Sequence, residues 1–181
     1  EVRITYERQG ADPVLRIVDN AMGMDYKELE QALKIANPPA INTGRCRYGM
    51  GMKTSSCWIG NLWQVTTKKL GETHEYSVTI DVKKIEQGDS QLDTKIIDGL
   101  DPSQHYTRIE IRNHNREFKG RTIGKIKQYL KSMYRMDFRN KTLSLYYNDE
   151  LMVWDEFDER LRVNRAGELY KREFMFDVSG K

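Results

Sequence analysis

The segment that most constrains the fold of this chain is Asp19-Asn20-Ala21-Met22-Gly23-Met24, because it separates a strand pattern from a helix pattern. An acidic side chain at the buried end of a strand costs free energy unless it has a partner. A carboxylate there can accept the exocyclic amine of an adenine, and a glycine four residues later lets the backbone approach the ring. The alternative is an Asp-Asn turn that only joins the strand to the helix.

A glycine-rich loop that runs into a helix is the second informative segment, and it covers residues 44–56, GRCRYGMGMKTSS. Closely spaced glycines let backbone amides converge on an anion, and the following helix start adds partial positive charge. The loop is not a Walker A motif, because Met50 follows Gly49 where lysine is required, and Thr54 occupies the last glycine position of GxGxxG. The alternative is an ordinary flexible loop.

Hydrophobic patterning predicts strands and helices in segregated order, which favours an α+β fold over a doubly wound parallel sheet. Asp25 and Glu28 form a capping-box signature for the first helix. The expected strands are residues 2–7, 14–18, 62–68, 75–82, 94–97, 107–112, 142–147, 151–154 and 173–178. The expected helices are residues 26–35, 52–59 and 118–135.

Composition excludes several classes of protein. In 181 residues, 38% of them hydrophobic, no stretch approaches the roughly 18 apolar residues of a membrane helix. The first residues lack the features of a signal peptide. Cys46 and Cys57 belong to no CxxC pair or zinc-type cluster, so we expect reduced thiols and no metal site. These features predict a cytoplasmic protein, or a nuclear one in a eukaryote.

In this order and separation, the two segments resemble the GHKL ATPases, the Bergerat-type fold of gyrase, MutL, heat-shock-chaperone and histidine-kinase ATPase domains. In that family a DxGxG box contacts adenine, a lid and a glycine-rich segment follow, and a later strand supplies a threonine near the aspartate. Residues 19–24, 48–53 and 105–111 match these features over most of residues 1–147. The resemblance implies a two-layer α/β sandwich of the Bergerat type, with a mixed, mostly antiparallel sheet and helices on one face.

The resemblance also implies a set of ATP contacts. Asp19 would bind adenine, and Thr107 would hydrogen-bond the network of Asp19 and the base. Gly23 and Met24 would line the adenine pocket, while the glycines and lysine of residues 49–53 would face the phosphates. The implied ATP-binding residues are Asp19, Gly23, Met24, Tyr48, Gly49, Met50, Gly51, Lys53 and Thr107.

Two departures from the family pattern concern the first box and the start of the sequence. Ala21 stands where the family has glycine, which keeps close packing feasible. The family's N-box helix carries a glutamate that activates water and an asparagine that binds Mg²⁺, and the sequence starts at the strand expected after that helix. Neither Asn20 nor Glu28 fits those roles. We therefore expect a fragment in which nucleotide binding is better supported than hydrolysis.

Within this class the sequence resembles Microrchidia-like and related bacterial proteins, where the lid leads into Gly-x-Gly-x-Lys as in residues 49–53. By this analogy ATP and Mg²⁺ are the cofactors, and ATP closes the lid and drives dimerisation. The implied partners are a second protomer and a DNA or protein client, with no membrane. Residues 1–117 are expected to form the ATP-binding domain, and residues 118–181 a connecting basic helix and the start of a transducer-like β segment.

Eight Lys or Arg and one acid, Asp137, lie between residues 119 and 141. Such a helix face can neutralise DNA phosphates, although a solvated helix face is the plainer interpretation. The candidate nucleic-acid contacts are Lys119, Arg121, Lys125, Lys131 and Arg135. Two other hypotheses are a histidine-kinase-like phosphotransfer domain, which the long segment after Thr107 disfavours, and a nucleotide-binding regulatory or nucleotide-blind scaffold domain without hydrolysis.

Overall fold

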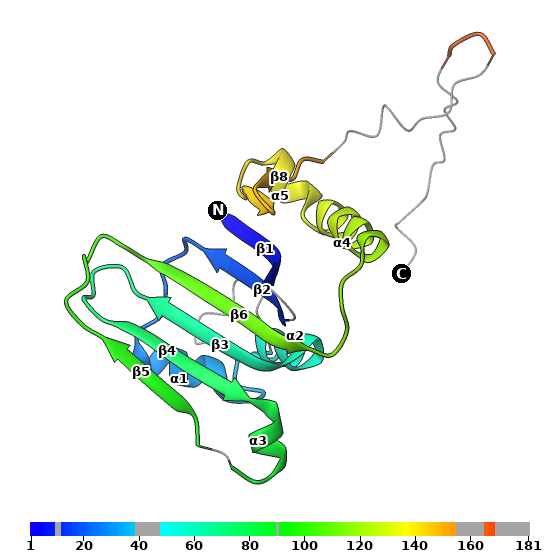
Figure 1. Ribbon diagram of the computed structural model, residues 1–181. Coiled ribbons are helices and arrows are strands. Elements are labelled where there is room, and N and C mark those ends of the chain that lie inside the picture. The colour runs from blue at the N-terminus through cyan, green and yellow to red at the C-terminus, as the bar shows by residue number, and fades with distance from the viewer. Residues whose placement is uncertain (10–11, 39–47, 90, 155–164, 169–181) are drawn as a thin grey trace, which may run out of the picture.

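The computed structural model describes residues 1–9, 12–38, 48–89, 91–154 and 165–168. Within these residues it contains one sheet in the order β5-β4-β3-β6-β2-β1-β7-β8 (Figure 1). The strands are β1 (Val2–Gln9), β2 (Asp12–Asp19), β3 (Gly60–Lys68), β4 (Glu75–Asp81), β5 (Asp93–Ile97), β6 (Tyr106–His114), β7 (Leu145–Tyr147) and β8 (Glu150–Leu151). The helices are α1 (Tyr26–Leu33), α2 (Gly51–Ile59), α3 (Val82–Glu86), α4 (Gly120–Met133) and α5 (Arg135–Arg139).

The sheet is mixed because one of its strand pairs is parallel. β1 and β7 run parallel, with Val2 opposite Leu145 and Ile4 opposite Tyr147, whereas the other paired strands are antiparallel. α4 and α5 connect β6 to β7. This long connection carries the chain across the sheet, so that β7 lies parallel to β1. The structure thus confirms the predicted α+β class and the mixed, mostly antiparallel sheet.

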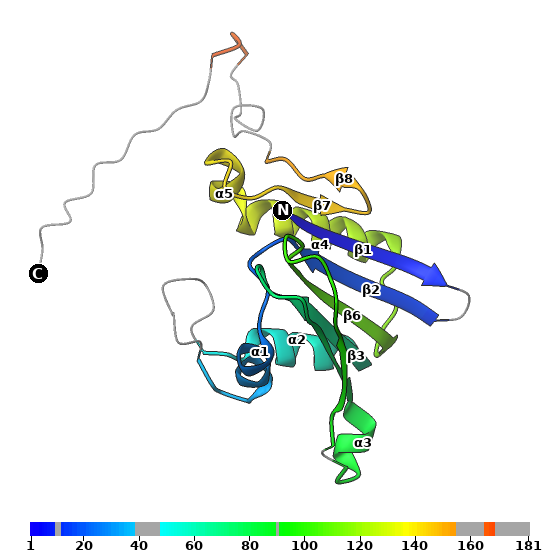
Figure 2. The same cartoon turned by 90° about the vertical axis from the view of Figure 1, so that its left-hand side faces the viewer.

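Strand register sorts the side chains onto two faces. The face that we call the covered face carries the buried core, to which the sheet contributes Tyr6, Leu15, Trp63, Val65, Val78, Ile80, Ile111, Leu145 and Tyr147. Leu29 of α1 belongs to the same cluster, and Met52 of α2 and Ile123 of α4 pack against it. Figure 2 shows α1 and α2 on the same side of the sheet. The sheet and these helices therefore form the two predicted layers.

The opposite face, here the polar face, has a different chemistry. The register places Arg3, Arg16, Arg108, Glu110 and Arg112 on it, together with Val18 and Thr66. The four arginine side chains are between 31% and 45% exposed. The alternation of apolar and polar residues along β1, β2 and β6 thus separates the core from solvent.

Most local predictions are confirmed. Asp25 and Glu28 form the expected capping box at the start of α1, and Gly60 ends α2 as expected. The helix expected at residues 118–135 is α4 at Gly120–Met133. A separate short helix, α5 at Arg135–Arg139, follows it because Tyr134 leaves the helical conformation at φ −100° and ψ 13°. This turn lets Tyr134 and Phe138 both pack against the core.

Two further differences follow from local backbone chemistry. α3 was not predicted, although Asp81 caps it by accepting from the amides of Lys83 and Lys84. The strand expected at residues 151–154 is only Glu150–Leu151, which closes a tight hairpin with β7. Asn148 and Asp149 form that turn at φ 46° and 64°, as two-residue hairpins require.

Some predictions concern residues outside the described ranges. The expected strand at residues 173–178 and Cys46 lie outside the described residues, while Cys57 is a free thiol. β7 and β8 extend the main sheet, and the division of the chain at residues 117 and 118 stays a prediction. Among the described residues, no helix has both the length and the apolar character needed to cross a membrane.

Candidate functional site

Three polar side chains lie side by side on the covered face, one from each of three neighbouring strands. Asp19 of β2 pairs with Thr107 of β6, which pairs in turn with Thr67 of β3. The hydroxyl oxygens of Thr67 and Thr107 are 3.2 Å apart, and Thr67 is fully buried. The register therefore builds a polar row at one end of an otherwise apolar face.

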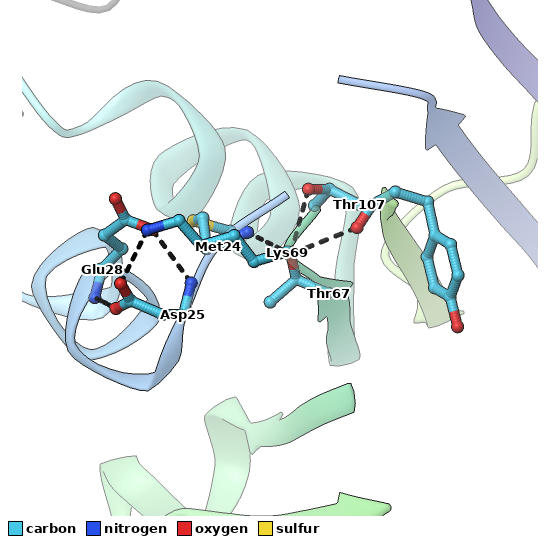
Figure 3. A network of polar contacts seen from close by, with 7 residues as sticks. Met24, Asp25, Glu28, Thr67, Lys69 and Thr107 are labelled. Carbon is cyan, nitrogen blue, oxygen red and sulfur yellow. Dashed lines mark hydrogen bonds and ion pairs between the residues drawn. The ribbon is translucent and has the colours of Figure 1, made fainter. Parts of the chain in front are cut away.

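The loop after Asp19 is fastened to this row. The Met24 amide donates to Thr67 Oγ1 over 2.9 Å, as Figure 3 shows. The Leu70 amide donates to the Met22 carbonyl over 2.9 Å. Two hydrogen bonds thus hold the loop backbone against the end of β3, beside Asp19.

Gly23 allows this close approach. Its φ is 69°, and a Cβ atom at this position would lie 1.9 Å from the Lys68 carbonyl oxygen. A left-handed backbone conformation and a contact this short both exclude other residues. The glycine of the first motif is therefore required for packing the loop onto β3.

The Asp19 carboxylate keeps unused hydrogen-bonding capacity. Its Oδ1 accepts from the Ala21 amide over 2.9 Å, and it accepts no other hydrogen bond from a residue that the structure describes. An ionised carboxylate has about four acceptor positions. The ring nitrogen Nδ1 of His105 lies 2.8 Å from the Ala21 carbonyl oxygen, so the segment before β6 holds the same loop. Asp19 is therefore positioned to accept from a ligand amine.

An ion-pair network fixes the start of α1 next to the site (Figure 3). Lys69 Nζ lies 2.8 Å from Asp25 Oδ2 and 2.9 Å from Glu28 Oε2. The hydrogen bond from Lys69, together with that from the Glu28 amide, holds the pKa of Asp25 below its usual value. Hydrogen bonds to these two carboxylates raise the pKa of Lys69. The network ties α1 to the residue that follows β3.

The second motif enters α2 through a turn that also needs glycine. Gly49 has a φ of 62°, and a Cβ atom there would lie 1.9 Å from the Asn37 carbonyl oxygen. Tyr48 is 76% exposed. Met50 is the N-cap of α2 without a side-chain capping bond, and a Cβ atom at Gly51 would meet nothing within 4 Å. The first amides of α2 are thus uncapped by the N-cap side chain and sterically open, whereas residues 44–47 lie outside the described part.

Lys53 points back from α2 to α1. Its Nζ donates to the Ala32 carbonyl over 2.5 Å, and the residue is only 9% exposed. The last carbonyls of a helix lack intrahelical partners and attract cations. In this conformation Lys53 therefore joins the end of α1 to α2.

A family model described as "Histidine kinase-, DNA gyrase B-, and HSP90-like ATPase" matches residues 1–110. The chain belongs to this GHKL ATPase family. The match spans both motifs and Thr107, so the family predicted from sequence is confirmed. No curated protein matches the sequence.

GHKL domains of known structure share this fold at low identity. The ATPase and transducer domains of topoisomerase II from Balamuthia mandrillaris have a TM-score of 0.53 and 16% identity, over 87% of this chain and 43% of that one. The topoisomerase IV ATP binding domain of Francisella tularensis, in complex with an inhibitor, has a TM-score of 0.50 and 16% identity, over 84% of this chain and 75% of that one. The Aquifex aeolicus MutL ATPase domain complexed with ADP has a TM-score of 0.47 and 12% identity, over 88% of this chain and 57% of that one. The chain thus spans about half the length of the MutL and topoisomerase II chains.

Three residues of this candidate site were not predicted from the sequence. Thr67, Lys69 and His105 each hold the loop of the first motif or the helix after it. The Thr66-Thr67-Lys68-Lys69 run at a strand end was the available signal for two of them. Their partners lie more than 40 residues away, so no local spacing revealed the contacts.

The basic residues proposed for nucleic acid lie apart from the ATP motifs. Lys119, Arg121, Lys125 and Arg135 are exposed on or beside α4 and α5, while Lys131 is partly buried. A pocket of about 270 Å³ between α1, β4 and β5 includes none of the candidate ATP residues. Among the described residues, no group of three acidic, histidine or cysteine side chains is arranged to hold a metal.

Proposed function

We propose that this GHKL chain binds ATP, with the adenine held by Asp19 on the covered face. The observation that carries the proposal is the open carboxylate of Asp19 beside the paired hydroxyls of Thr107 and Thr67. The exocyclic amine of adenine donates to Asp19, and a threonine hydroxyl bonds to the base. Because Met24 and Gly23 are held on β3, little conformational entropy is lost when the base enters.

The phosphates bind at the start of α2. Uncapped amides and the helix dipole favour an anion there, and the open space at Gly51 lets oxygen atoms approach the backbone. Gly49 supports this role indirectly, because it shapes the turn against Asn37. Tyr48 and Met50 flank the same turn.

The contact of Lys53 with the Ala32 carbonyl supports the proposal that ATP closes the glycine-rich lid. A triphosphate competes with the Ala32 carbonyl for the ammonium group, and a charged acceptor is the stronger partner. Transfer of Lys53 from Ala32 to a phosphate changes the connection between α1 and α2, which couples ATP to a conformational change. Dimerisation, a transducer-like role for residues 118–181 and DNA contact through α4 extend this proposal by analogy.

Hydrolysis is not assigned to residues of this chain. GHKL enzymes use Mg²⁺, and the described residues contain no group of three His, Cys, Asp or Glu side chains that could hold a metal ion. The function that we propose for this chain is the binding of adenine and phosphate.

The test compares ATP with GTP. Guanine carries an oxygen acceptor where adenine carries the amine, so Asp19 should repel it. We expect calorimetry to give at least tenfold tighter binding of ATP than GTP. ATP at 100 times its dissociation constant should add about 2.7 kcal/mol to the free energy of unfolding, or roughly 5–11 °C for a domain of this size.

The Asp19→Asn variant should lose both the affinity and the discrimination while its apo melting temperature stays unchanged. Asp93→Asn on the exposed edge strand β5 removes the same charge away from the site and is the matched control. If Asp19→Asn and Asp93→Asn bind ATP equally well, Asp19 does not contact the base.

A further inference from the structure

The polar face contains a groove whose shape follows from strand register. Arg3, Val18 and Arg108 are aligned across β1, β2 and β6, since Val18 pairs with Arg3 on one side and with Arg108 on the other. A short side chain between two long ones leaves a depression, roughly 10 Å wide at two strand spacings. The resulting pocket has a volume of about 400 Å³.

Arginine dominates the walls of this groove. Arg3, Arg16 and Arg108 line it, together with Tyr106, Asn20 and the end of β2. Asp19 also borders the groove, but the register directs its side chain to the covered face. Glu1 lines the groove and is paired with Arg3 at 2.6 Å. Beyond that pair, the wall has the positive side chains of Arg16 and Arg108, of which Arg16 is paired with Glu110.

The arginines retain donors for a ligand. Arg16 uses Nε to bond Glu110 at 2.8 Å, and Glu110 also pairs with Arg112 at 3.4 Å, so one carboxylate serves two guanidinium groups. Arg108 donates no hydrogen bond to any residue that the structure describes, and its nearest carboxylate oxygen, on Glu75, is 3.9 Å away. Glu75 already accepts from the Tyr106 hydroxyl. A guanidinium has five donors in a planar fork.

We propose that this groove binds phosphate groups, on the face of the sheet opposite the adenine row. Planar guanidinium forks match phosphate oxygens and bind them in pairs. Several arginines around one groove favour a ligand with more than one negative charge, such as an oligophosphate or consecutive phosphates of a nucleic-acid strand. An oligophosphate and a nucleic-acid strand both present phosphate oxygens to Arg16 and Arg108.

The nucleotide-free protein serves for the test, with inorganic tripolyphosphate in calorimetry and a labelled single-stranded oligothymidylate in anisotropy titrations. Arg108→Gln removes a side chain that makes no hydrogen bond within the described residues, so the fold should persist. Arg112→Gln is the matched control, because Arg112 lies on the same strand and face, is 41% exposed against 39% for Arg108, and does not line the groove.

We expect Arg108→Gln to weaken at least one probe tenfold or more and Arg112→Gln to weaken it less than twofold. Arg108→Lys should recover only part of the loss, because lysine keeps the charge but not the fork. If the ligand is a nucleic-acid strand, Arg108→Gln should weaken the binding of oligothymidylate, and that binding should fall steeply with salt. If the ligand is a small oligophosphate, Arg108→Gln should weaken the binding of tripolyphosphate alone. Failure of both probes to bind, or equal weakening by both Gln variants, would overturn the proposal. Because neither probe contains adenine, both of these outcomes are independent of whether Asp19 binds adenine.

Discussion

Asp19 and Thr107 are direct cross-strand partners on β2 and β6, although they lie far apart in the sequence. Thr67 on β3 extends this pair to a third strand. The candidate adenine site therefore forms only when three strands are in register, and a change in any of them should alter nucleotide affinity. This relationship leads to predictions that separate binding from stability.

Thr67→Val should weaken ATP binding at least tenfold. The substitution removes the acceptor of the Met24 amide, which frees the loop beside Asp19. It should also lower the free energy of unfolding by about 1–3 kcal/mol, because the part-buried Met24 amide loses its acceptor. Calorimetric ATP titration and urea unfolding measure the two effects.

Thr66→Val is the control for this prediction. Thr66 is also buried, but it bonds Ser77 on the polar face, 2.9 Å away. We expect a comparable loss of stability with unchanged ATP affinity. A similar drop in affinity in both variants would mean that Thr67 acts only through general stability.

The two glycines at the start of α2 should behave differently. Gly49→Ala forces a left-handed conformation and a clash with Asn37, so it should destabilise the fold by more than about 1 kcal/mol. A Cβ atom at Gly51 has free space around it. Gly51→Ala should therefore leave the free energy of unfolding unchanged or raise it by up to about 1 kcal/mol, since alanine favours helix. Its methyl group should nevertheless weaken ATP binding by obstructing the amides.

Adenosine separates the two roles of Gly51, because it lacks phosphates. We expect Gly51→Ala to bind adenosine as tightly as the wild type and ATP more weakly, both measured by calorimetry. Equal affinity of the variant and the wild type for ATP would place the phosphates elsewhere.

The sequence revealed those features that depend on neighbouring residues. The capping box of Asp25 and Glu28 and the stop at Gly60 involve local backbone amides, and both were predictable. The contacts of Thr67 with Met24 and of Lys53 with Ala32 depend on how distant segments pack. The family resemblance placed Lys53 at the phosphates, but the conformation in which it bonds α1 is a tertiary property.

Acid should weaken the attachment of α1 to β3. The pKa of Asp25 is lowered in the folded protein by Lys69 and the Glu28 amide, so its contribution to stability is present above the unfolded pKa of about 3.9 and is lost as pH falls through the folded pKa. Asp25→Asn keeps a capping oxygen but removes the charge. We expect urea unfolding of this variant to show a smaller loss of stability below pH 4 than the wild type, and parallel curves would contradict the assignment.

Alkali should act through Tyr106 on the polar face. Burial, and then the hydrogen bond to Glu75, raises the pKa of Tyr106 to about 12. Its contribution to stability is therefore complete below the unfolded pKa of about 10 and is lost as pH rises toward 12. Tyr106→Phe leaves the buried Glu75 carboxylate without its donor, so at pH 8 it should cost about 1–3 kcal/mol.

Because the wild type loses the tyrosine contribution in alkali and the variant has none to lose, the difference between them should narrow between pH 10 and 12. Urea unfolding at pH 8, 10 and 11.5 measures this difference, and tyrosinate absorbance follows the ionisation directly. A difference in stability that stays constant over this range would show that Tyr106 ionises no later in the folded chain than in the unfolded one.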